Sequence, residues 1–394
     1  MKPFELHNNI FWIGALHPDL KIFDILMKTK HGTTYNSYLI KEEKTAIIDT
    51  VKTKFSDEYL QNIASLTDFS EIDYIIVNHC EPDHSGSLAN LLDKAGNAQV
   101  VSTKMAEKMV KGLVNKNVKF SVVGDGDMLD LGGKTLKFVS APFLHWPETM
   151  FTYLEENHIL FSCDAFGSHF CDTRMFNDLV GEFYPEFNYY YKVIMRPFAK
   201  NVRKALSKIE DIKIDMIAPS HGPILRRDTS KYINAYSDWS AELPVNNPKK
   251  LLIFYASAHG NTEVMARYIA EGIRDSSVET ETIDVVEYNF AEIADAVEKS
   301  DGILVGSPTI NADAVLPVWE VLSNLATINV KGKIAASFGS YAWSGEAPSM
   351  LDERLRSLKF KVPEEGLKVY LVPSDEEISM CKDFGRKIAS HLIE

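Results

Sequence analysis

The chain has 394 residues, of which 45% are hydrophobic and 25% charged, a composition typical of a globular protein with two or three domains. Its formal net charge of -13 argues against nucleic acid or an anionic membrane as a partner, and leaves docking to another protein open. The N-terminus lacks the apolar segment of a signal peptide and no stretch approaches a transmembrane span, so we expect a cytoplasmic protein.

Short β-type runs broken by turns dominate the first part of the chain, with helical patterns between some of them. Strands are expected over 10–14, 37–40, 46–49, 74–77, 135–140, 150–154 and 159–162, and helices over 57–65 and 104–114. A longer helical pattern covers 189–209, and a short strand is expected over 214–218. Strand runs with interspersed helices favour an α/β sandwich of sheets flanked by helices.

The segment 242–248 contains two prolines and two asparagines without periodicity, and is typical of a linker. It divides the chain into expected domains 1–245 and 249–394. In the second, strands are predicted over 251–255, 280–285, 302–306, 334–338 and 367–371. They alternate with helices over 263–275, 290–299, 315–325, 348–358 and 375–392. Five βα units in succession indicate a doubly wound parallel sheet.

Four side chains able to bind metal stand within the six residues His79-Cys80-Glu81-Pro82-Asp83-His84, directly after an apolar strand. Pro82 should end that strand, so we expect these side chains in a loop. Imidazoles with carboxylates suit iron or another transition metal. Three more candidates, His145, Asp164 and His221, also stand where apolar runs end.

The four cysteines, at positions 80, 163, 171 and 381, form no CxxC pair. This argues against an iron–sulfur or rubredoxin-type centre, and reduced thiols are the simpler interpretation. Cys80 and Cys163 flank metal-ligand candidates, but alternation at strand ends should point them away from the metal.

Three loops after strands of the second domain, at 257–263, 306–311 and 339–345, resemble the loops of flavodoxins and so predict a flavin mononucleotide (FMN) site. The first, between strand and helix, is rich in small and hydroxyl residues and lacks Lys and Arg, which suits a monophosphate better than a triphosphate. The absence of GxGxxG argues against a dinucleotide. The candidate FMN-binding residues are Ser257, His259, Gly260, Asn261, Thr262, Pro308, Thr309, Ile310, Asn311, Ser340, Tyr341, Trp343 and Gly345.

The metal motif resembles that of the metallo-β-lactamase superfamily, with Glu81 where a zinc hydrolase normally has histidine. Together with Leu144-His145-Trp146-Pro147, Asp164-Ala165-Phe166-Gly167 and Ser220-His221-Gly222, the chain resembles the flavodiiron proteins. The resemblance implies an N-terminal metallo-β-lactamase-like αββα sandwich followed by a flavodoxin-like domain. It also implies two non-haem irons, one held by His79, Glu81 and His145, the other by Asp83, His84 and His221, with Asp164 bridging.

The same resemblance implies reduction of O2 to water, of NO to N2O, or both. FMN would receive electrons from an external donor: a rubredoxin, another flavoprotein or a reduced deazaflavin. Relatives assemble head to tail, which implies a homodimer or a dimer of dimers. His169 and Tyr190 match stretches near the open iron face and are candidate proton donors. Two departures stand out: Asp24 where many relatives have histidine, and His259 where flavodoxins usually have a hydroxyl residue.

Two other functions remain open from the sequence. One is a zinc hydrolase fused to a flavodoxin-like electron carrier, which stoichiometric zinc and hydrolytic activity would support. The other is a redox or gas sensor that uses the same cofactors without fast turnover. Glu81 counts against the first, and the full set of seven ligand candidates makes the second less attractive.

Overall fold

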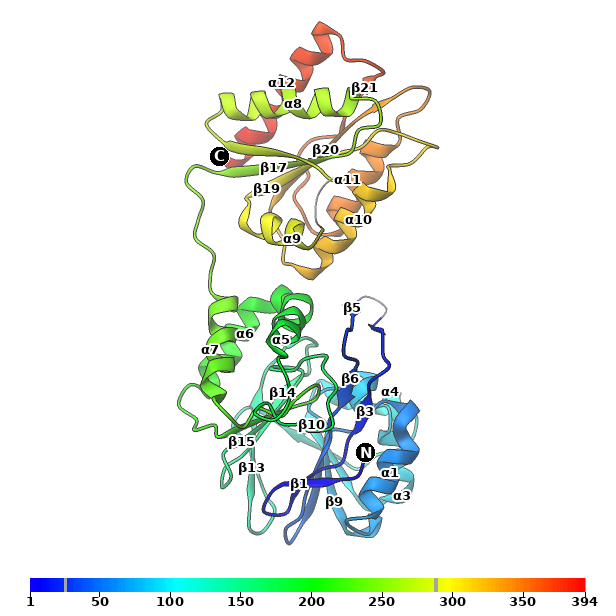
Figure 1. The fold of residues 1–394 in the computed structure, drawn as a ribbon, viewed down its shortest axis with the longest axis vertical. Helices are drawn as coiled ribbons and strands as arrows, with labels where there is room; N and C mark the ends of the chain where they lie inside the picture. Colours follow the sequence, from blue (N-terminus) through cyan, green and yellow to red (C-terminus); the bar gives the residue numbers. More distant parts are fainter. Residues whose placement is uncertain (25–26, 287–289, 394) are drawn as a thin grey trace. The chain divides into compact units, whose positions relative to one another are not determined.

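The computed structural model describes residues 1–24, 27–286 and 290–393. The chain forms two compact units, Met1–Ala241 and Glu242–Glu394, which are described separately (Figure 1). The expected domain boundaries, 1–245 and 249–394, stay a prediction.

Two sheets form the first unit. The larger has the order β1-β2-β7-β8-β9-β10-β11, with β1 Phe4–His7, β2 Ile10–Trp12, β7 Tyr38–Ile40, β8 Thr45–Ile48, β9 Ile72–Ile76, β10 Gln99–Thr103 and β11 Phe120–Val123. The smaller has the order β12-β13-β14-β15-β16, with β12 Met128–Asp130, β13 Thr135–Ser140, β14 Met150–Leu154, β15 Ile159–Cys163 and β16 Met216–Pro219. Two short antiparallel pairs join β3 Ala15–His17 with β6 Thr33–Tyr35, and β4 Ile22–Phe23 with β5 Met27–Lys28.

The layers of this unit follow from strands that are apolar on both faces. Successive residues of a strand point to opposite faces. Ile48 and Ile76 therefore pack with Phe138 and Phe161 between the two sheets, while Ile47 contributes to a second core under the helices. The helices are α1 Ser56–Ala64, α2 Pro82–Ser85, α3 Leu88–Lys94, α4 Ala106–Val114, α5 Tyr184–Tyr190, α6 Ala199–Ile209 and α7 Thr229–Ser240.

Two expectations about secondary structure in this unit were wrong. The single helix expected over 189–209 is broken: α5 ends at Tyr190, a π-helical turn covers Tyr191–Met195, a 3-10 turn covers Arg196–Phe198, and α6 follows. Pro197 explains the break, because proline lacks an N–H for the helical hydrogen bond and its ring crowds a carbonyl of the preceding turn. The expected loop at Pro82 is a helical turn, since proline is tolerated at the first helical position.

The second unit is a five-stranded parallel sheet of order β18-β17-β19-β20-β21, which confirms the predicted doubly wound fold. Its strands are β17 Lys250–Tyr255, β18 Glu279–Asp284, β19 Gly302–Gly306, β20 Ile334–Tyr341 and β21 Leu367–Tyr370. Its helices are α8 Asn261–Asp275, α9 Phe290–Lys299, α10 Leu316–Asn324, α11 Ala347–Ser357 and α12 Asp375–Ile393. Residues of α8 and α12 pack on one face of the sheet, and residues of α9, α10 and α11 on the other.

The order of these strands places a crevice where ligands bind in such folds. The chain moves from β17 to β18 on one side and then crosses to β19 on the other, so the loops at the carboxyl ends of β17 and β19 diverge there. Two of the predicted FMN loops follow β17 and β19, and the third consists of the last residues of β20 and the turn after it.

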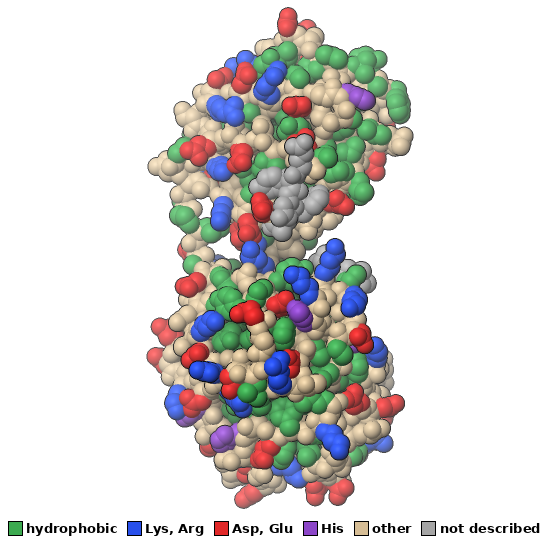
Figure 2. Space-filling model, in the orientation of Figure 1, with side chains coloured by type: hydrophobic (Ala, Val, Ile, Leu, Met, Phe, Trp, Pro, Cys, Tyr) green, Lys and Arg blue, Asp and Glu red, His purple; other side chains and the backbone are tan. Residues whose placement is uncertain are grey.

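Charged side chains are interspersed on the visible faces of both units, with Lys and Arg among Asp and Glu (Figure 2). Within the described ranges, no helix combines the length and the apolar character needed to cross a bilayer.

Helices α8 and α12 approach closely at two glycines, and this contact predicts a stability effect. A Cβ on Gly272 would lie 2.0 Å from the Lys382 carbonyl oxygen, and one on Gly385 would lie 2.2 Å from the Ile269 carbonyl oxygen. Gly272→Ala should therefore destabilise the second unit by about 1–3 kcal/mol, the usual cost of overpacking. Chemical denaturation followed by circular dichroism measures this change.

Gly112→Ala is the matched control, because Gly112 lies inside α4 and a Cβ there would meet nothing within 4 Å. It should stabilise the first unit by roughly 0.5–1 kcal/mol, since alanine loses less backbone entropy on folding. Equal effects of the two substitutions would contradict the close helix contact.

Candidate metal centre and flavin site

The seven predicted metal ligands come together at one end of the two sheets of the first unit. His79, Asp164 and His221 stand just past the carboxyl ends of β9, β15 and β16. His145 lies in the loop between β13 and β14, and the remaining three ligands surround the start of α2: Glu81, Asp83 and His84. Buried strands thus fix the backbone from which each side chain projects.

Four of these side chains form a first group: His79, Glu81, His145 and Asp164. His145 Nε2 lies 2.9 Å from Glu81 Oε2 and 3.3 Å from Asp164 Oδ2. His79 Nε2 lies 3.3 Å from the same Glu81 oxygen and 3.5 Å from Asp164 Oδ2.

The second group consists of Asp83, His84 and His221. His84 Nε2 lies 3.3 Å from Asp83 Oδ1 and 3.0 Å from Asp164 Oδ1. His221 Nε2 lies 3.0 Å from Asp83 Oδ2 and 3.4 Å from Asp164 Oδ1.

Asp164 connects the groups. Its Oδ2 faces the two histidines of the first group and its Oδ1 faces the two histidines of the second. One carboxylate with each oxygen directed at a different ligand set is the arrangement of a bridging ligand between two metal ions.

Several of the converging atoms are buried without a hydrogen bond in the described part of the chain. They are Asp83 Oδ1 and Oδ2, His84 Nε2, Asp164 Oδ2 and His221 Nε2. Buried polar atoms are normally satisfied, and buried charges are paired or coordinate metals. The donor set therefore fits two transition-metal ions of the kind that imidazole and carboxylate prefer.

Two histidines of the site are oriented through their other ring nitrogen. His79 Nδ1 lies 2.8 Å from Glu148 Oε1, and His221 Nδ1 lies 2.6 Å from the Thr34 carbonyl oxygen. Such partners leave Nε2 free to bind metal. Sequence reasoning missed both. For Glu148 the signal was an acidic residue three positions after His145, whereas a backbone carbonyl such as that of Thr34 leaves no trace in the sequence.

The structure brings both candidate proton donors to the metal ligands. The Tyr190 hydroxyl donates to Asp164 Oδ1 over 2.9 Å. The ring of His169 lies 4.9 Å from that of Tyr190 and 5.4 Å from that of His221, and its Nδ1 lies 3.0 Å from Thr33 Oγ1. Burial, with the charge of His221, holds the pKa of His169 well below its usual value, so the ring is neutral near pH 7.

A cavity of about 340 Å³ reaches His169 and is also lined by Lys28, Thr29, Lys30, Pro185, Glu186 and Tyr189. Asp24 belongs to the surroundings of the same site. Its burial, followed by the charges of Glu81 and Asp83, raises the pKa of Asp24 to about 6. Where many relatives have histidine, this chain therefore has a carboxyl group that interacts electrostatically with the ligand candidates Glu81 and Asp83.

Cys80 and Cys163, which flank ligand candidates in the sequence, differ in where their side chains lie. Cys80 packs in the apolar core, as expected. Cys163 was expected to point away, but its Sγ lies within 4.8 Å of ligand atoms of His84 and Asp164. The reason is local: Cys163 has φ 51°, so the side-chain alternation of β15 is broken at its last residue.

In the second unit the three predicted loops meet through hydrogen bonds. Thr262 Oγ1 lies 2.9 Å from Ser340 Oγ, and the Thr309 amide donates to the Ser340 carbonyl over 3.0 Å. Ser257 Oγ accepts from the Glu263 amide in the first turn of α8. The crevice is thus built by residues of all three loops.

Other predicted flavin residues lie around this crevice. Gly260 has φ 83° and would accommodate a Cβ without contact within 4 Å, so the space beside it is open. Pro308 is buried, whereas His259, Ile310 and Asn311 are exposed. Trp343 is 77% exposed, and Tyr341 packs against Tyr370 at 5.7 Å. Asn261 and Gly345 are half-buried. An open loop before a helix N-terminus fits a phosphate, and exposed aromatic residues fit an aromatic ring system.

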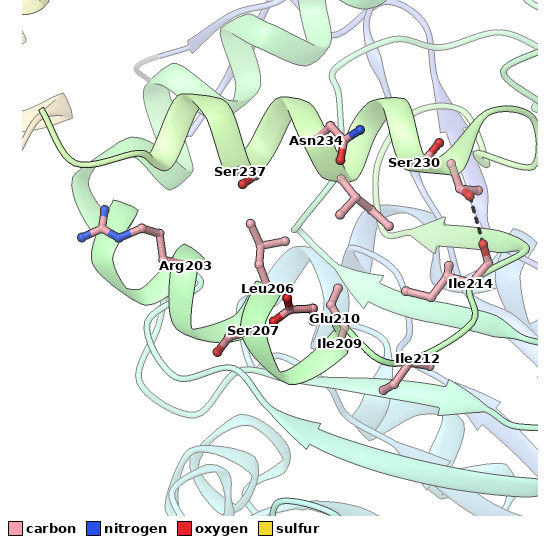
Figure 3. Close-up of a pocket in the computed structure, with 12 residues that line it drawn as sticks. Arg203, Leu206, Ser207, Ile209, Glu210, Ile212, Ile214, Ser230, Asn234 and Ser237 are labelled. Carbon is pink, nitrogen blue, oxygen red and sulfur yellow. Dashed lines mark hydrogen bonds between the residues drawn. The ribbon is translucent and has the colours of Figure 1, made fainter.

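A further cavity, of about 630 Å³, lies between α6 and α7 (Figure 3). Leu206, Ile212 and Ile233 contribute apolar surface to it, and none of the seven metal-ligand candidates lines it. This cavity is therefore not part of the candidate metal centre.

Comparison with known proteins settles the family. The chain is 43% identical over 403 residues to the flavo-diiron protein FprA2 of Clostridium acetobutylicum, with 100% of both chains covered. The chain belongs to the flavodiiron protein family. Residues 33–222 match the family model described as ODP family beta lactamase, and residues 253–385 match that described as flavodoxin.

Other flavodiiron relatives carry functional names. The chain is 38% identical to the anaerobic nitric oxide reductase flavorubredoxin of Salmonella arizonae, covering 97% of this chain and 81% of the relative. The solved structure of rubredoxin oxygen:oxidoreductase from Desulfovibrio gigas superposes with a TM-score of 0.74 at 29% identity, covering 100% of this chain and 99% of that one. These matches confirm the expected metallo-β-lactamase-like and flavodoxin-like fold.

The electrostatics of the candidate ligand set predict that metal binding displaces protons. Burial lowers the pKa of His145, but the adjacent carboxylates of Asp164 and Glu81 outweigh it and raise that pKa to about 10. Although burial opposes it, the charge of His84 and the adjacent ring of His145 hold the pKa of Asp164 well below its usual value. Without metal, His145 is therefore protonated at neutral pH.

Ferrous iron should consequently release at least about one proton on binding at pH 7, and its affinity should rise with pH below the pKa of His145. Anaerobic titration calorimetry in buffers of different ionisation enthalpy counts these protons. His145→Ala should reduce the count, while His158→Ala, at a histidine outside the ligand groups, should not. Iron binding without proton release would contradict the protonated site.

Proposed function

We propose that this chain is a flavodiiron oxidoreductase that reduces O2 to water, NO to N2O, or both, with electrons supplied through FMN by an external donor. The observation that carries the proposal is the sharing of Asp164 between two groups of histidine and carboxylate ligands. The names of an NO reductase and an oxygen oxidoreductase among its relatives support it.

In this proposal His79, Glu81 and His145 would hold one iron, Asp83, His84 and His221 would hold the other, and Asp164 would be shared between them. Two irons held there would supply a site for binding and reducing a diatomic molecule, and bound FMN would supply electrons singly or in pairs. Three carboxylates and four imidazoles offset much of the charge of two ferrous ions.

The protein's own residues control protons and water at this site. Tyr190 is buried and donates to Asp164 Oδ1, which holds the bridging carboxylate in place. Neutral His169 is held at Nδ1 by Thr33 Oγ1, and its Nε2 is buried without a hydrogen bond in the described residues. We propose that His169 and Tyr190 are the groups that donate protons or hydrogen bonds to reduced oxygen or nitrogen.

We propose that the loops after β17, β19 and β20 bind FMN. The first loop and the N-terminus of α8 would hold the phosphate: Ser257, His259, Gly260, Asn261 and Thr262. The other two would surround the isoalloxazine: Pro308, Thr309, Ile310, Asn311, Ser340, Tyr341, Trp343 and Gly345. Thr262 and Ser340 bond to each other, so part of their contribution is to join the loops.

We further propose a cytoplasmic head-to-tail homodimer, or a dimer of such dimers, in which FMN of one subunit serves the irons of the other. Support comes from exposed apolar residues in the segments after the carboxyl ends of β19, β20 and β21, with Leu316 at 68%, Trp343 at 77% and Val372 at 71% exposure. Exposed apolar side chains gathered around a site are typical of a surface that is covered. A rubredoxin, another flavoprotein or a reduced deazaflavin would deliver the electrons.

Asp164→Ala tests the bridge. Loss of the shared carboxylate should abolish magnetic coupling between the irons and lower kcat by more than the roughly 10–100-fold typical of outer-sphere changes. Mössbauer and EPR spectra of iron-loaded protein, with anaerobic NO and aerobic O2 electrode assays, measure both effects. Asp172→Ala is the control, because Asp172 pairs with Arg174 outside the ligand groups. Coupling that survived in Asp164→Ala would contradict the bridging assignment.

Dilution tests the assembly. Turnover per subunit should fall as the protein dissociates, while FMN and iron stay bound, because the two cofactors of one subunit do not serve each other. Analytical ultracentrifugation and steady-state assays over the same concentration range measure this. Full activity in the monomer would contradict the proposed arrangement.

Stoichiometric zinc with hydrolytic activity would instead support the alternative function, a zinc hydrolase fused to a flavodoxin-like electron carrier.

A further inference from the structure

Glu148 is a buried acid in contact with only one of the two metal groups. Its Oε1 lies 2.8 Å from His79 Nδ1, and the side chains of both residues are 0% exposed. The same oxygen accepts a hydrogen bond from the Cys80 amide over 2.9 Å. Glu148 is therefore fixed to the ligand and to the backbone next to it.

The hydrogen bond determines which form of His79 meets the metal. With its proton on Nδ1 and donated to Glu148, the ring presents the Nε2 lone pair toward Glu81 and Asp164. A carboxylate behind a histidine ligand also makes the imidazole a stronger electron donor. Glu148 thus acts on the geometry and on the donor strength of His79.

The corresponding contact in the second group carries no charge. His221 Nδ1 faces the carbonyl oxygen of Thr34 at 2.6 Å. A neutral carbonyl fixes the ring as a carboxylate does, but it adds less electron density to the ligand. The contacts behind these two rings therefore differ by one negative charge, while in the second group the buried Asp49 carboxyl also acts electrostatically on His84.

That charge has little compensation from the rest of the protein. Glu148 Oε2 is buried and makes no hydrogen bond to any residue that the structure describes. A buried carboxylate is costly unless an opposite charge lies near. His79 is the ionisable side chain that Glu148 contacts, so the metal that His79 would hold is the compensating charge.

We propose that Glu148 is a positioning residue that makes the two irons unequal. Through His79 it strengthens the binding of the iron in the His79–Glu81–His145 group and favours the ferric state there over the iron in the other group. This inference rests on the proposed diiron function.

Two substitutions separate the orienting effect from the charge. Glu148→Gln keeps an oxygen that accepts from His79 and Cys80 but removes the charge, and Glu148→Ala removes both. Glu107→Gln is the control, because Glu107 pairs with Lys104 and Lys111 on the surface. Full-length protein is reconstituted with FMN and ⁵⁷Fe, and its flavin content and circular dichroism confirm the fold.

The readouts are iron(II) binding isotherms, Mössbauer spectra and an EPR-monitored redox titration. Glu148→Ala should weaken one of the two binding steps by about 10–100-fold and leave the other nearly unchanged. Glu148→Gln should retain two irons, move the potential of one iron to a more positive value, and change one of the two Mössbauer doublets. The Glu107→Gln variant should match the wild type in all three.

Unchanged doublets and potentials in Glu148→Gln would overturn the proposal, and so would equal weakening of both binding steps in Glu148→Ala. If Glu148→Ala does not fold, the near-isosteric Gln variant decides. None of these readouts depends on O2 or NO turnover. A wild-type protein that binds two irons but reduces neither gas would therefore refute the proposed function and leave this inference standing.

Discussion

The site depends on one carboxylate shared by two sets of histidines. Asp164 directs Oδ2 toward His79 and His145, and Oδ1 toward His84 and His221. Four imidazoles around a single buried acid are not a stable hydrogen-bonded core on their own, since several of the facing atoms lack hydrogen bonds within the described residues. Two bound cations would coordinate these buried atoms and so remove the cost of leaving them unpaired. The fold therefore favours the binding of metal ions, which redox chemistry can use.

The sandwich supplies the rigidity that such sharing requires. Strands β9, β15 and β16 are largely buried and end at the same side of the unit, so the ligands that follow them start from fixed backbone positions. Tyr190 and Glu148 then hold two of the ligands from behind. The flavin crevice arises in the same manner, because parallel strands deliver three loops to one edge of a sheet.

The sequence predicted those parts of the site that have a local signal. Each metal ligand stands at the end of an apolar run, and the parallel sheet of the second unit repeats regularly. Other parts depend on distant contacts: Glu148 meets His79 across 69 positions, and Thr34 acts through its backbone carbonyl. Pro197 and the π-helical turn before it broke a helix that periodicity alone had extended. The φ of 51° at Cys163 overrode strand alternation.

Anomalous diffraction at the iron edge, from crystals of the iron-loaded protein, tests the central claim most directly. The account predicts two iron peaks on opposite sides of Asp164, one beside Glu81 and the other beside Asp83. A single peak, or zinc in place of iron, would contradict it.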